Sequence, residues 1–259
     1  MSEWNASHYN HISTCQKMLA EEELHRLTLR GNERILDVGC GDGKVTAEIA
    51  HLVPRGAVVG VDPSHNMIDF ATGHFPPVAY GNLRFSVADA RSLPFLEEFD
   101  LVVSFNALHW VHEQDAALRS IFNALKSGGR ATLRFVPKSP VALENTIEDT
   151  RQTPRWAKWF PDFKPPFAHF TPEEYRTMAE AAGFDVDHIR VEDRSWDFGS
   201  KQAFEDFCSA TFVEWLRLIP EADRPAFTAD VLQRYRAAAP EGGENAFRFQ
   251  QMEVALVKK

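Results

Sequence analysis

The chain is poor in the features that mark secreted, membrane and nucleic-acid-binding proteins. Only three of its 259 residues are cysteine, Cys15, Cys40 and Cys208, and no C-x-x-C pair occurs, which argues against a disulfide framework or a cysteine zinc site. No apolar run reaches the ~20 residues that cross a bilayer, and the polar start Met-Ser-Glu-Trp-Asn is unlike a secretory signal. The net charge of −9 argues against a nucleic-acid partner.

Internal repeats and low-complexity tracts are also absent from the sequence. Hydrophobic residues make up 44% and charged residues 25% of the chain, which is ordinary for a globular protein, and the length allows one domain with a substantial core. We therefore expect a cytoplasmic protein that acts on a small molecule. The expected assembly is a monomer or a homodimer, with no membrane and no nucleic acid as partner.

What the sequence does contain is a glycine-rich turn near residue 40. The apolar pair Ile35-Leu36 and an acid lead into alternating glycines at 39, 41 and 43, and residues 45–50 follow with a helical pattern. Glycine lets the backbone approach a ligand closely or take a positive φ, and the start of a helix offers unpaired N–H groups. The segment predicts a buried strand, a ligand-binding turn and a helix.

The spacing of these glycines excludes two common nucleotide-binding motifs. A dinucleotide fingerprint requires G-x-G-x-x-G, and Lys44 occupies the place of the third glycine. A P-loop requires G-K-[S/T] at a fixed distance, and that sequence is missing. The turn must therefore serve another kind of ligand.

Three further predicted strands end in polar residues. The strand Val58–Asp62 ends in an acid that can accept both hydroxyls of a ribose. The strand Leu83–Val87 leads to Asp89, an acid placed to accept from the exocyclic amine of an adenine. The strand within Phe99–Trp110 leads into a polar and aromatic mouth.

Together, these motifs resemble those of class I S-adenosylmethionine (SAM) methyltransferases. They read D-V-G-C-G-D-G, G-V-D-P-S, V-A-D-A and F-D-L-V-V-S-F-N-A-L-H-W, in the expected order and spacing over roughly residues 33–136. The alternative is another doubly wound α/β protein with chance glycines. The resemblance implies SAM as cofactor and S-adenosylhomocysteine as product.

The pattern of apolar residues predicts alternating strands and helices. We expect strands over 34–38, 57–62, 83–87, 100–105, 130–136, 184–198 and 247–257. We expect helices over 12–30, 43–52, 64–73, 115–126, 171–183, 200–218 and 221–238, with Ser127-Gly128-Gly129 ending the helix before the fifth strand. The resemblance implies a doubly wound, seven-stranded, mostly parallel sheet, α/β in class and Rossmann-like, with the last strand antiparallel and inserted between its neighbours.

We interpret residues 1–259 as a single methyltransferase domain with a helical cap. The core is expected at about 31–136, 171–198 and 247–257. The cap is expected at about 1–30, 137–170 and 199–246, over the carboxyl ends of the strands, where open α/β sheets bind ligands.

The resemblance assigns cofactor roles to residues of the first two motifs. The turn from Asp37 through Gly39, Cys40 and Gly41 approaches the amino-acid part of SAM, although Asp37 is alternatively a buried acid that only stabilises the turn. Asp62 holds the ribose hydroxyls. In the same segment, Pro63 and Met67 cover the adenine ring, unless Met67 is plain helix core.

The third and fourth motifs supply the remaining cofactor contacts. Asp89 and the Ala90 N–H meet the adenine amine, or Asp89 is a surface turn acid. The backbone of Asn106 faces the methionine moiety, or its side chain caps a turn.

Within the class, the chain resembles trans-aconitate and juvenile-hormone-acid methyltransferases, which both methylate a carboxylate oxygen. The shared features are Trp4-Asn5-x-x-x-Tyr9, L-H-W at 108–110 and a helical C-terminal cap. The resemblance implies that Tyr9 closes over SAM, that Trp4 orders the N-terminal segment, and that His109 and Trp110 line the acceptor site. The alternative is an aromatic N-terminal stretch that only packs on the cap.

The acceptor decides which residues the chemistry needs. A carboxylate is already ionised at pH 7 and needs no base, whereas an alcohol or phenol needs one, and His109 is the candidate. A carboxylate also favours a cation in the pocket, unless the available cations are only solvated. These cations are Arg134, Arg151, Arg155 and Lys158, and Trp156 and Trp159 are the cap aromatics expected beside the acceptor.

The leading hypothesis is thus methyl transfer to a small acid, with three alternatives. One is a secondary-metabolite O-, N- or C-methyltransferase that uses His109 as base. Another is an ester-forming enzyme of biotin synthesis, whose substrate is attached to a carrier protein, and the last is a SAM-binding module without catalysis. No metal is expected, because the pairs His109/His112 and His8/His11 have no evident third ligand.

Overall fold

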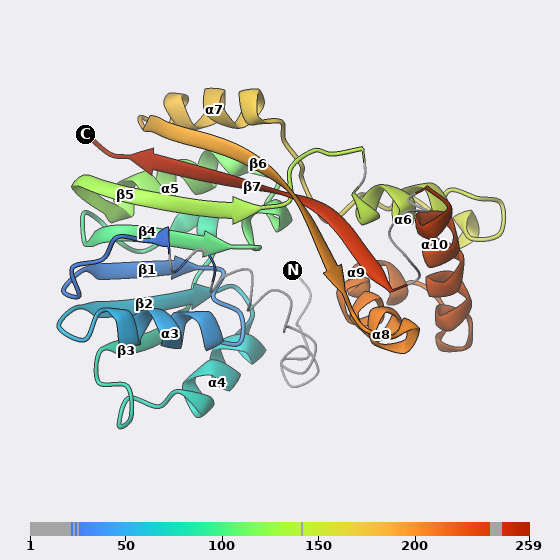
Figure 1. Cartoon of the computed structure of the whole chain (residues 1–259), viewed down its shortest axis with the longest axis horizontal. Helices are drawn as coiled ribbons and strands as arrows, with labels where there is room; N and C mark the ends of the chain where they lie inside the picture. The colour runs from blue at the N-terminus through green and yellow to red at the C-terminus, as the bar shows by residue number, and fades with distance from the viewer. Residues whose placement is uncertain (1–21, 23, 25, 141, 239–244) are drawn as a thin grey trace.

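A single mixed sheet forms the centre of the molecule (Figure 1). The computed structural model describes residues 22, 24, 26–140, 142–238 and 245–259. The strands are β1 (Arg34–Val38), β2 (Ala57–Asp62), β3 (Leu83–Val87), β4 (Phe99–Phe105), β5 (Leu125–Phe135), β6 (Asp185–Asp197) and β7 (Ala246–Val257). Their order is β3-β2-β1-β4-β5-β7-β6, with β7 antiparallel to both of its neighbours. The predicted seven-stranded sheet with an inserted antiparallel last strand is confirmed.

Helices connect the strands and cover both faces of the sheet. The α-helices are α3 (Lys44–Leu52), α4 (His65–His74), α5 (Gln114–Ala124), α6 (Leu143–Arg151), α7 (Pro172–Ala181), α8 (Lys201–Thr211), α9 (Val213–Leu216) and α10 (Arg224–Ala238). Short 3₁₀ turns are η1 (Ala90–Ser92), η2 (Leu108–Trp110), η3 (Ala157–Trp159) and η4 (Glu221–Asp223). None of the described helices combines the length and the apolar character needed to span a bilayer.

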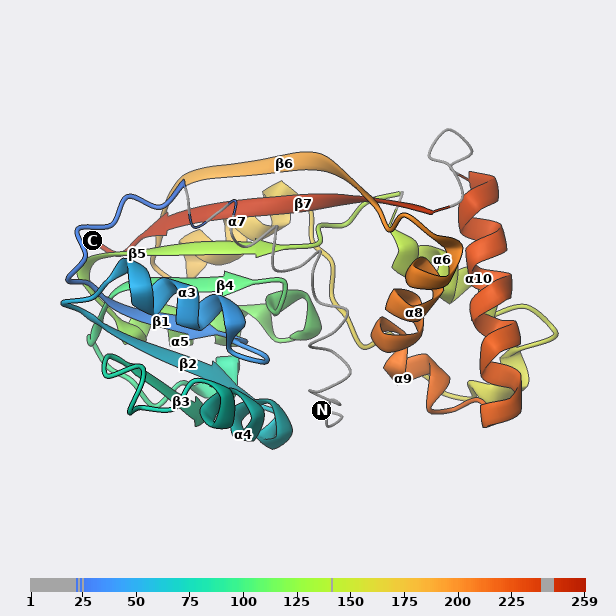
Figure 2. The same ribbon diagram turned by 60° about the horizontal axis from the view of Figure 1, so that its bottom comes forward.

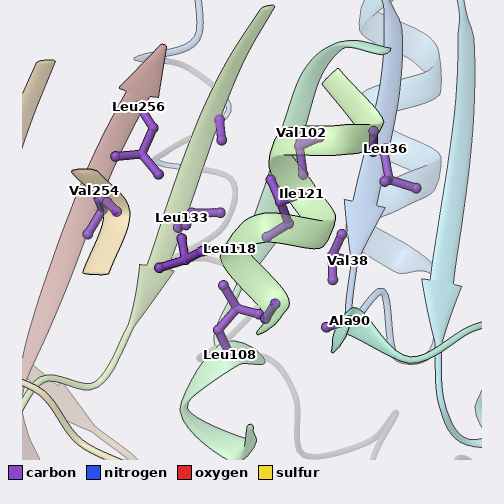
Figure 3. Close-up of a cluster of buried hydrophobic side chains, with 14 of the residues drawn as sticks. Leu36, Val38, Ala90, Val102, Leu108, Leu118, Ile121, Leu133, Val254 and Leu256 are labelled. Atoms are coloured by element: carbon purple, nitrogen blue, oxygen red, sulfur yellow. The ribbon is translucent and has the colours of Figure 1, made fainter. Parts of the chain in front are cut away.

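The core lies in two layers, one on each face of the sheet. On one face α5 and α7 pack against the central strands, and Figure 3 shows Leu118 and Ile121 of α5 among Val102 and Leu133 of the sheet. On the other face, α3 packs on residues such as Ile35. Strands with apolar residues on both faces are typical of a parallel sheet covered by helices.

A third hydrophobic cluster belongs to the cap, and is built from α6, α8, α9, α10 and the segment around η3. Its most buried large residues include Trp215, Phe204 and Phe227. The cap lies beyond the carboxyl end of β5, and the long strands β6 and β7 run from the sheet into it (Figures 1 and 2). Leu24, Leu27 and Leu29 fall in the predicted cap range 1–30 but pack in the cluster on the α3 face of the sheet. The division of the chain into core and cap ranges stays a prediction.

Most predicted elements are found within two residues of their predicted bounds, but the start of β5 was predicted wrongly. Helix α5 ends at Ala124 and β5 begins at Leu125, whereas the strand was expected only from residue 130. The glycines at 128 and 129 do not end the helix. Gly128 has a φ of 74° and lies in an irregular part of β5, where the register with β4 shifts. The positive φ serves this bulge instead of a helix C-cap.

The cap segments differ more from expectation. Helix α6 was not predicted, and the helix expected over 200–218 is broken at Phe212 into α8 and α9. The helix expected over 12–30 falls mostly outside the described residues, and its described end, 27–30, is not helical.

The predicted start of α7 is confirmed in detail. The hydroxyl of Thr171 accepts from the Glu174 N–H at 3.2 Å, and the Glu174 carboxylate accepts from the Thr171 N–H at 2.8 Å. Pro172 occupies the first turn. This capping box orients the helix that carries the chain from the cap back to the sheet.

Candidate active site

The glycine turn after β1 is held against its two neighbouring strands. The N–H groups of Gly39 and Cys40 both donate to the Val61 carbonyl of β2, at 2.7 and 3.0 Å. Gly39 has a φ of 80°, and a Cβ at this position would lie 2.1 Å from the Cβ of Ala107, just beyond β4. Glycine is therefore required here, because the turn packs directly on the backbone that follows β4.

Asp62 ends β2 and faces the same turn. Its Oδ2 accepts from the Gly41 N–H at 3.1 Å, and its Oδ1 accepts from the Ser64 N–H at 2.9 Å. These bonds fix the carboxylate between the glycine turn and the start of α4. The neighbouring Pro63 is half-buried, whereas Met67 is only 4% exposed, as expected of a helix-core residue.

Asp37 lies beneath the turn rather than at its surface. It is 2% exposed and accepts from the Thr46 hydroxyl of α3 at 2.7 Å. Burial raises the pKa of Asp37 to about 7, and the negative charge of Asp62 adds to the rise while the Thr46 hydrogen bond opposes it. These contacts stabilise the turn, and a cofactor role for Asp37 stays a prediction.

Asp89 caps η1 at the end of the third motif. Its carboxylate accepts from the Arg91 N–H and from the Arg91 guanidinium, at distances of 2.6–3.1 Å, and these contacts lower the pKa of Asp89. Arg91 also contacts Glu113 at 3.0 Å. Ala90 is buried beside it. A carboxylate has about four lone-pair positions, so an adenine amine would share Asp89 with Arg91.

Asn106 follows β4 with a φ of 56°, in the left-handed region. Its N–H donates to the Arg134 carbonyl at 2.7 Å, and its Oδ1 accepts from the Nε2 of Gln251 at 2.8 Å. Arg134 and Gln251 are each only 2% exposed. The structure thus adds buried polar groups of β5 and β7 to the end of β4.

His109 lies in η2, three residues beyond Asn106. It is 6% exposed, and its ring centroid lies 5.4 Å from that of Trp110 and 6.3 Å from that of His169. Among the described residues, neither His109 Nδ1 nor His169 Nε2 has a hydrogen-bond partner. Burial lowers the pKa of His109 to about 3, with a smaller contribution from His169, and lowers that of His169 to about 4. Both rings are therefore neutral near pH 7.

The two predicted aromatics of the described cap, Trp156 and Trp159, both contact other cap residues. Trp156 is 3% exposed, packs against Phe227, and donates its indole N–H to Asp230 at 2.8 Å. Trp159 is half-buried, with the Lys158 ammonium 4.9 Å from its ring centroid. Trp4 and Tyr9 lie outside the described residues. Contact of these four aromatics with a substrate or cofactor stays a prediction.

The predicted cations also divide between cap and sheet. Arg151 pairs with Glu148 at 2.6 Å, and Arg155 pairs with Asp230 at 2.9 Å, so both bind acids of the cap. Arg134 is the predicted cation that lies at the end of the sheet beside Asn106. It is the one that the geometry brings to the candidate site.

A cavity of about 590 Å³ opens next to this site, within the range of small-molecule pockets. Its wall is formed by η2, the start of α5, the loop at 161–166 and α9. Trp110 and Arg91 line it from the sheet side, and Lys164 and Arg217 from the cap side. Within the described part of the chain, no cluster of three or more His, Cys, Asp or Glu side chains could hold a metal ion.

Sequence reasoning missed Gln251 and His169. Gln251 is buried on one face of β7, and the alternating residues Met252, Val254 and Leu256 are buried on the other face. A polar residue at a buried strand position was the available signal. His169 has no comparable signal, because it follows the proline-rich loop of the cap.

The backbone at the strand ends leaves room for a ligand along the glycine turn. Beside Gly41, which has a φ of 52°, no atom lies within 4 Å of the place that a Cβ would take, so a side chain there would fill open space along the turn. Asp62 is fixed at one side of that space, and Asn106 ends the neighbouring strand. Such an arrangement suits a ligand that approaches the backbone closely.

Comparisons with known proteins agree with this geometry. A family model described as a methyltransferase domain matches residues 35–129. The chain is 31% identical over 193 residues to juvenile hormone acid O-methyltransferase of Bombyx mori, covering 70% of this chain and 68% of the relative. It is 28% identical over 240 residues to trans-aconitate 2-methyltransferase of Escherichia coli, covering 91% of this chain and 88% of the relative.

Solved structures agree on the fold. The YcgJ protein of Bacillus subtilis matches with a TM-score of 0.65 and 20% identity, over 93% of this chain and 97% of that one. Phosphoethanolamine N-methyltransferase 2 of Haemonchus contortus, in complex with S-adenosyl-L-methionine, matches with a TM-score of 0.61 and 19% identity, over 98% and 56%. The motifs, the sheet topology and these relatives lead to one conclusion: the chain belongs to the class I S-adenosylmethionine-dependent methyltransferases and is an enzyme of that class.

Proposed function

We propose that the enzyme transfers the methyl group of S-adenosylmethionine to a carboxylate oxygen of a small-molecule acid. The observation that carries this proposal is the state of His109. A group with a pKa of about 3 is a poor general base at neutral pH, because catalytic bases are most effective with a pKa near the working pH. A carboxylate acceptor is already ionised and needs no base.

In this proposal the residues at the strand ends hold the methyl donor. Asp62 binds the ribose, the turn at Gly39, Cys40 and Gly41 lies along the amino-acid part, and Asn106 faces that part from β4. Asp89, Ala90, Pro63 and Met67 surround the adenine, with Tyr9 closing over the donor. When bound, S-adenosylmethionine supplies an electrophilic methyl group on a sulfonium that departs as a neutral thioether.

The chain's own contribution is then alignment and exclusion of water. The acceptor oxygen must lie in line with the methyl carbon and the sulfur, and such positioning supplies most of the rate when no proton is transferred. The cap beyond the carboxyl ends of the strands would keep water from the reacting atoms. Arg134, buried at the end of β5, is the proposed counter-charge for the carboxylate.

The relatives' names support this acceptor class. One relative is named as an acid O-methyltransferase, and another as a methyltransferase of trans-aconitate. A hydroxyl or phenol acceptor is the second candidate, favoured by the buried Nδ1 of His109, which has no partner among the described residues. In that case His109 would accept the proton.

The test is transfer of a labelled methyl group to trans-aconitate, juvenile hormone acid, dodecanoic acid and a set of phenols. A methyl ester releases its label as volatile methanol in mild alkali, whereas an ether or N-methyl product keeps it. We expect alkali-labile label, and we expect His109→Asn to keep the wild-type rate within about tenfold. Alkali-stable label, with a loss of ~10²-fold or more in His109→Asn, would favour a hydroxyl acceptor and His109 as base.

A further inference from the structure

The conformation of Asn106 is unusual for a residue with a side chain. Its φ of 56° lies in the left-handed region, which costs a non-glycine residue energy unless neighbouring contacts hold it there. Residues held in this way cluster at ligand sites. The question is what holds Asn106.

The contacts of Asn106 come from two other strands. Its N–H donates to the Arg134 carbonyl of β5 at 2.7 Å, which fixes the backbone. Its side-chain oxygen accepts from the Nε2 of Gln251 of β7 at 2.8 Å, which fixes the side chain. Gln251 is therefore the side chain that reaches Asn106 from across the sheet.

Gln251 has little use as a purely structural residue. It is 2% exposed, and its Oε1 has no hydrogen-bond partner among the residues that the structure describes. Burying an amide with one end unpartnered is unfavourable, and an apolar residue of similar size would fit the interior of the sheet better. A glutamine at this position has a use if its amide acts on Asn106.

The position of Asn106 in turn sets the glycine turn. Ala107, the next residue, lies so close to Gly39 that a Cβ on Gly39 would come within 2.1 Å of the Ala107 Cβ. A change in the backbone at 106 would shift Ala107 and the turn with it. A contact chain therefore runs from Gln251 through Asn106 and Ala107 to Gly39.

We propose that Gln251 is a positioning residue: it holds Asn106 in its left-handed conformation and so shapes the part of the site that takes the amino-acid end of the methyl donor. This inference rests on the proposed placement of the donor. Gln251 acts through Asn106 and does not need to contact the reacting atoms.

The experiment compares two ligands by calorimetry on the full chain. S-adenosylhomocysteine carries the amino-acid end, and 5′-deoxy-5′-methylthioadenosine lacks it. We expect Gln251→Leu to weaken binding of the first by about tenfold, the effect of one lost hydrogen bond of typical strength, and to change binding of the second by less than about twofold. The matched control is Gln250→Leu on the opposite face of β7, where the Gln250 amide binds Asp193.

A second pair of variants tests the route through Asn106. Asn106→Gly removes the side chain that Gln251 contacts, and glycine takes a positive φ without strain. In that background, Gln251→Leu should cause no further loss. The melting temperature of Gln251→Leu should be unchanged or higher, and Gln251→Met replaces it if the leucine variant does not fold.

The outcomes separate this inference from the function on which it rests. Wild-type protein that binds neither ligand would overturn both. Three results, each with normal ligand binding by the wild type, would overturn the positioning role alone. They are unchanged binding of S-adenosylhomocysteine in Gln251→Leu, an equal loss for both ligands, or a loss from Gln251→Leu that persists in the Asn106→Gly background.

Discussion

Each oxygen of the Asp62 carboxylate accepts one backbone N–H, from Gly41 and from Ser64. In the proposed function, the same carboxylate also accepts from the hydroxyls of a ribose. One side chain would then join the glycine turn to α4 and bind the ligand. Substitution of this residue should affect both tasks, and the two effects can be separated.

We expect Asp62→Ala to weaken binding of S-adenosylhomocysteine by about 1–3 kcal/mol, because hydrogen bonds to an ionised group are lost. Asp62→Asn keeps one carbonyl acceptor and should fall between alanine and wild type. Titration calorimetry measures both, and Asp69→Ala on the exposed side of α4 is the control. Equal affinity in wild type and Asp62→Ala would remove the ribose role.

The sequence predicts those site residues that directly follow a strand. It misses site residues that are distant in sequence and come close only in the folded structure. Asp62 and Asp89 stand directly behind apolar runs, so their place at the sheet edge follows from the pattern. Gln251 contacts Asn106 from 145 residues away, and His169 meets His109 through the path of the cap loop. No local pattern encodes such pairings, which depend on tertiary packing.

The turn between β1 and α3 depends on glycines that do different work. Gly39 is confined by Ala107, whereas Gly41 has no atom within 4 Å of an added Cβ. Both have a positive φ, of 80° and 52°, so any other residue is strained at either position. Of these two positions, only Gly39 lies where the protein itself also excludes a side chain.

We expect Gly39→Ala to lower the melting temperature strongly and to abolish measurable binding of S-adenosylhomocysteine, because β1 and β4 must separate. Gly41→Ala should lose roughly 1–2 kcal/mol of stability from the positive φ, yet still lose affinity because its methyl group enters the ligand space. Calorimetry and thermal melting distinguish the two. Gly73→Ala in α4, where an added Cβ meets nothing within 4 Å, is the control; equal behaviour of the variants at 39 and 41 would contradict this account.

The first strands of the sheet were predicted well, and the segments of the cap less well. The apolar runs of β1, β2 and β3 gave their bounds to the residue. Helix α6 was missed although Leu143, Ile147 and Thr150 are buried at helical spacing, because the prolines that flank it favour a loop. The early start of β5 depends on a bulge whose register is set by β4, which no local pattern reveals.

At the scale of the molecule, His109 and His169 mark the place where the sheet meets the cap. His109 belongs to η2 behind β4, and His169 to the loop that leads from the cap to α7. The N–H of Ala168 donates to the His109 carbonyl at 2.8 Å, which ties the two parts together. Both imidazole rings are buried in the neutral form where the sheet meets the cap. The free energy of folding therefore depends on their protonation.

This coupling predicts how stability depends on pH. The pKa values of His109 and His169 fall from 6.5 to about 3 and about 4 on folding. Their contribution is complete above about pH 6.5 and is lost as the pH falls toward those values, because the unfolded chain takes up protons that the folded chain refuses. Each histidine lowers the free energy of unfolding by up to about 1.4 kcal/mol per pH unit in this range.

Urea unfolding at pH 7, 6 and 5 measures the effect. We expect His169→Phe to show a shallower fall in stability than the wild type, and the exposed His65→Asn to match the wild type. The same slope in His169→Phe and wild type would show that this ring is not buried uncharged.

The first half of the chain's final strand lies outside the broad sheet. β7 pairs with β5 only from Met252 onward, and Ala246–Gln251 pairs with β6 alone, so a two-stranded ribbon continues into the cap (Figure 2). A ribbon of two strands twists more freely than a broad sheet. Gln251 is the last residue of this ribbon before β7 pairs with β5. A shift of this ribbon would therefore move the cap relative to the sheet while the pairing of β7 with β5 stays unchanged.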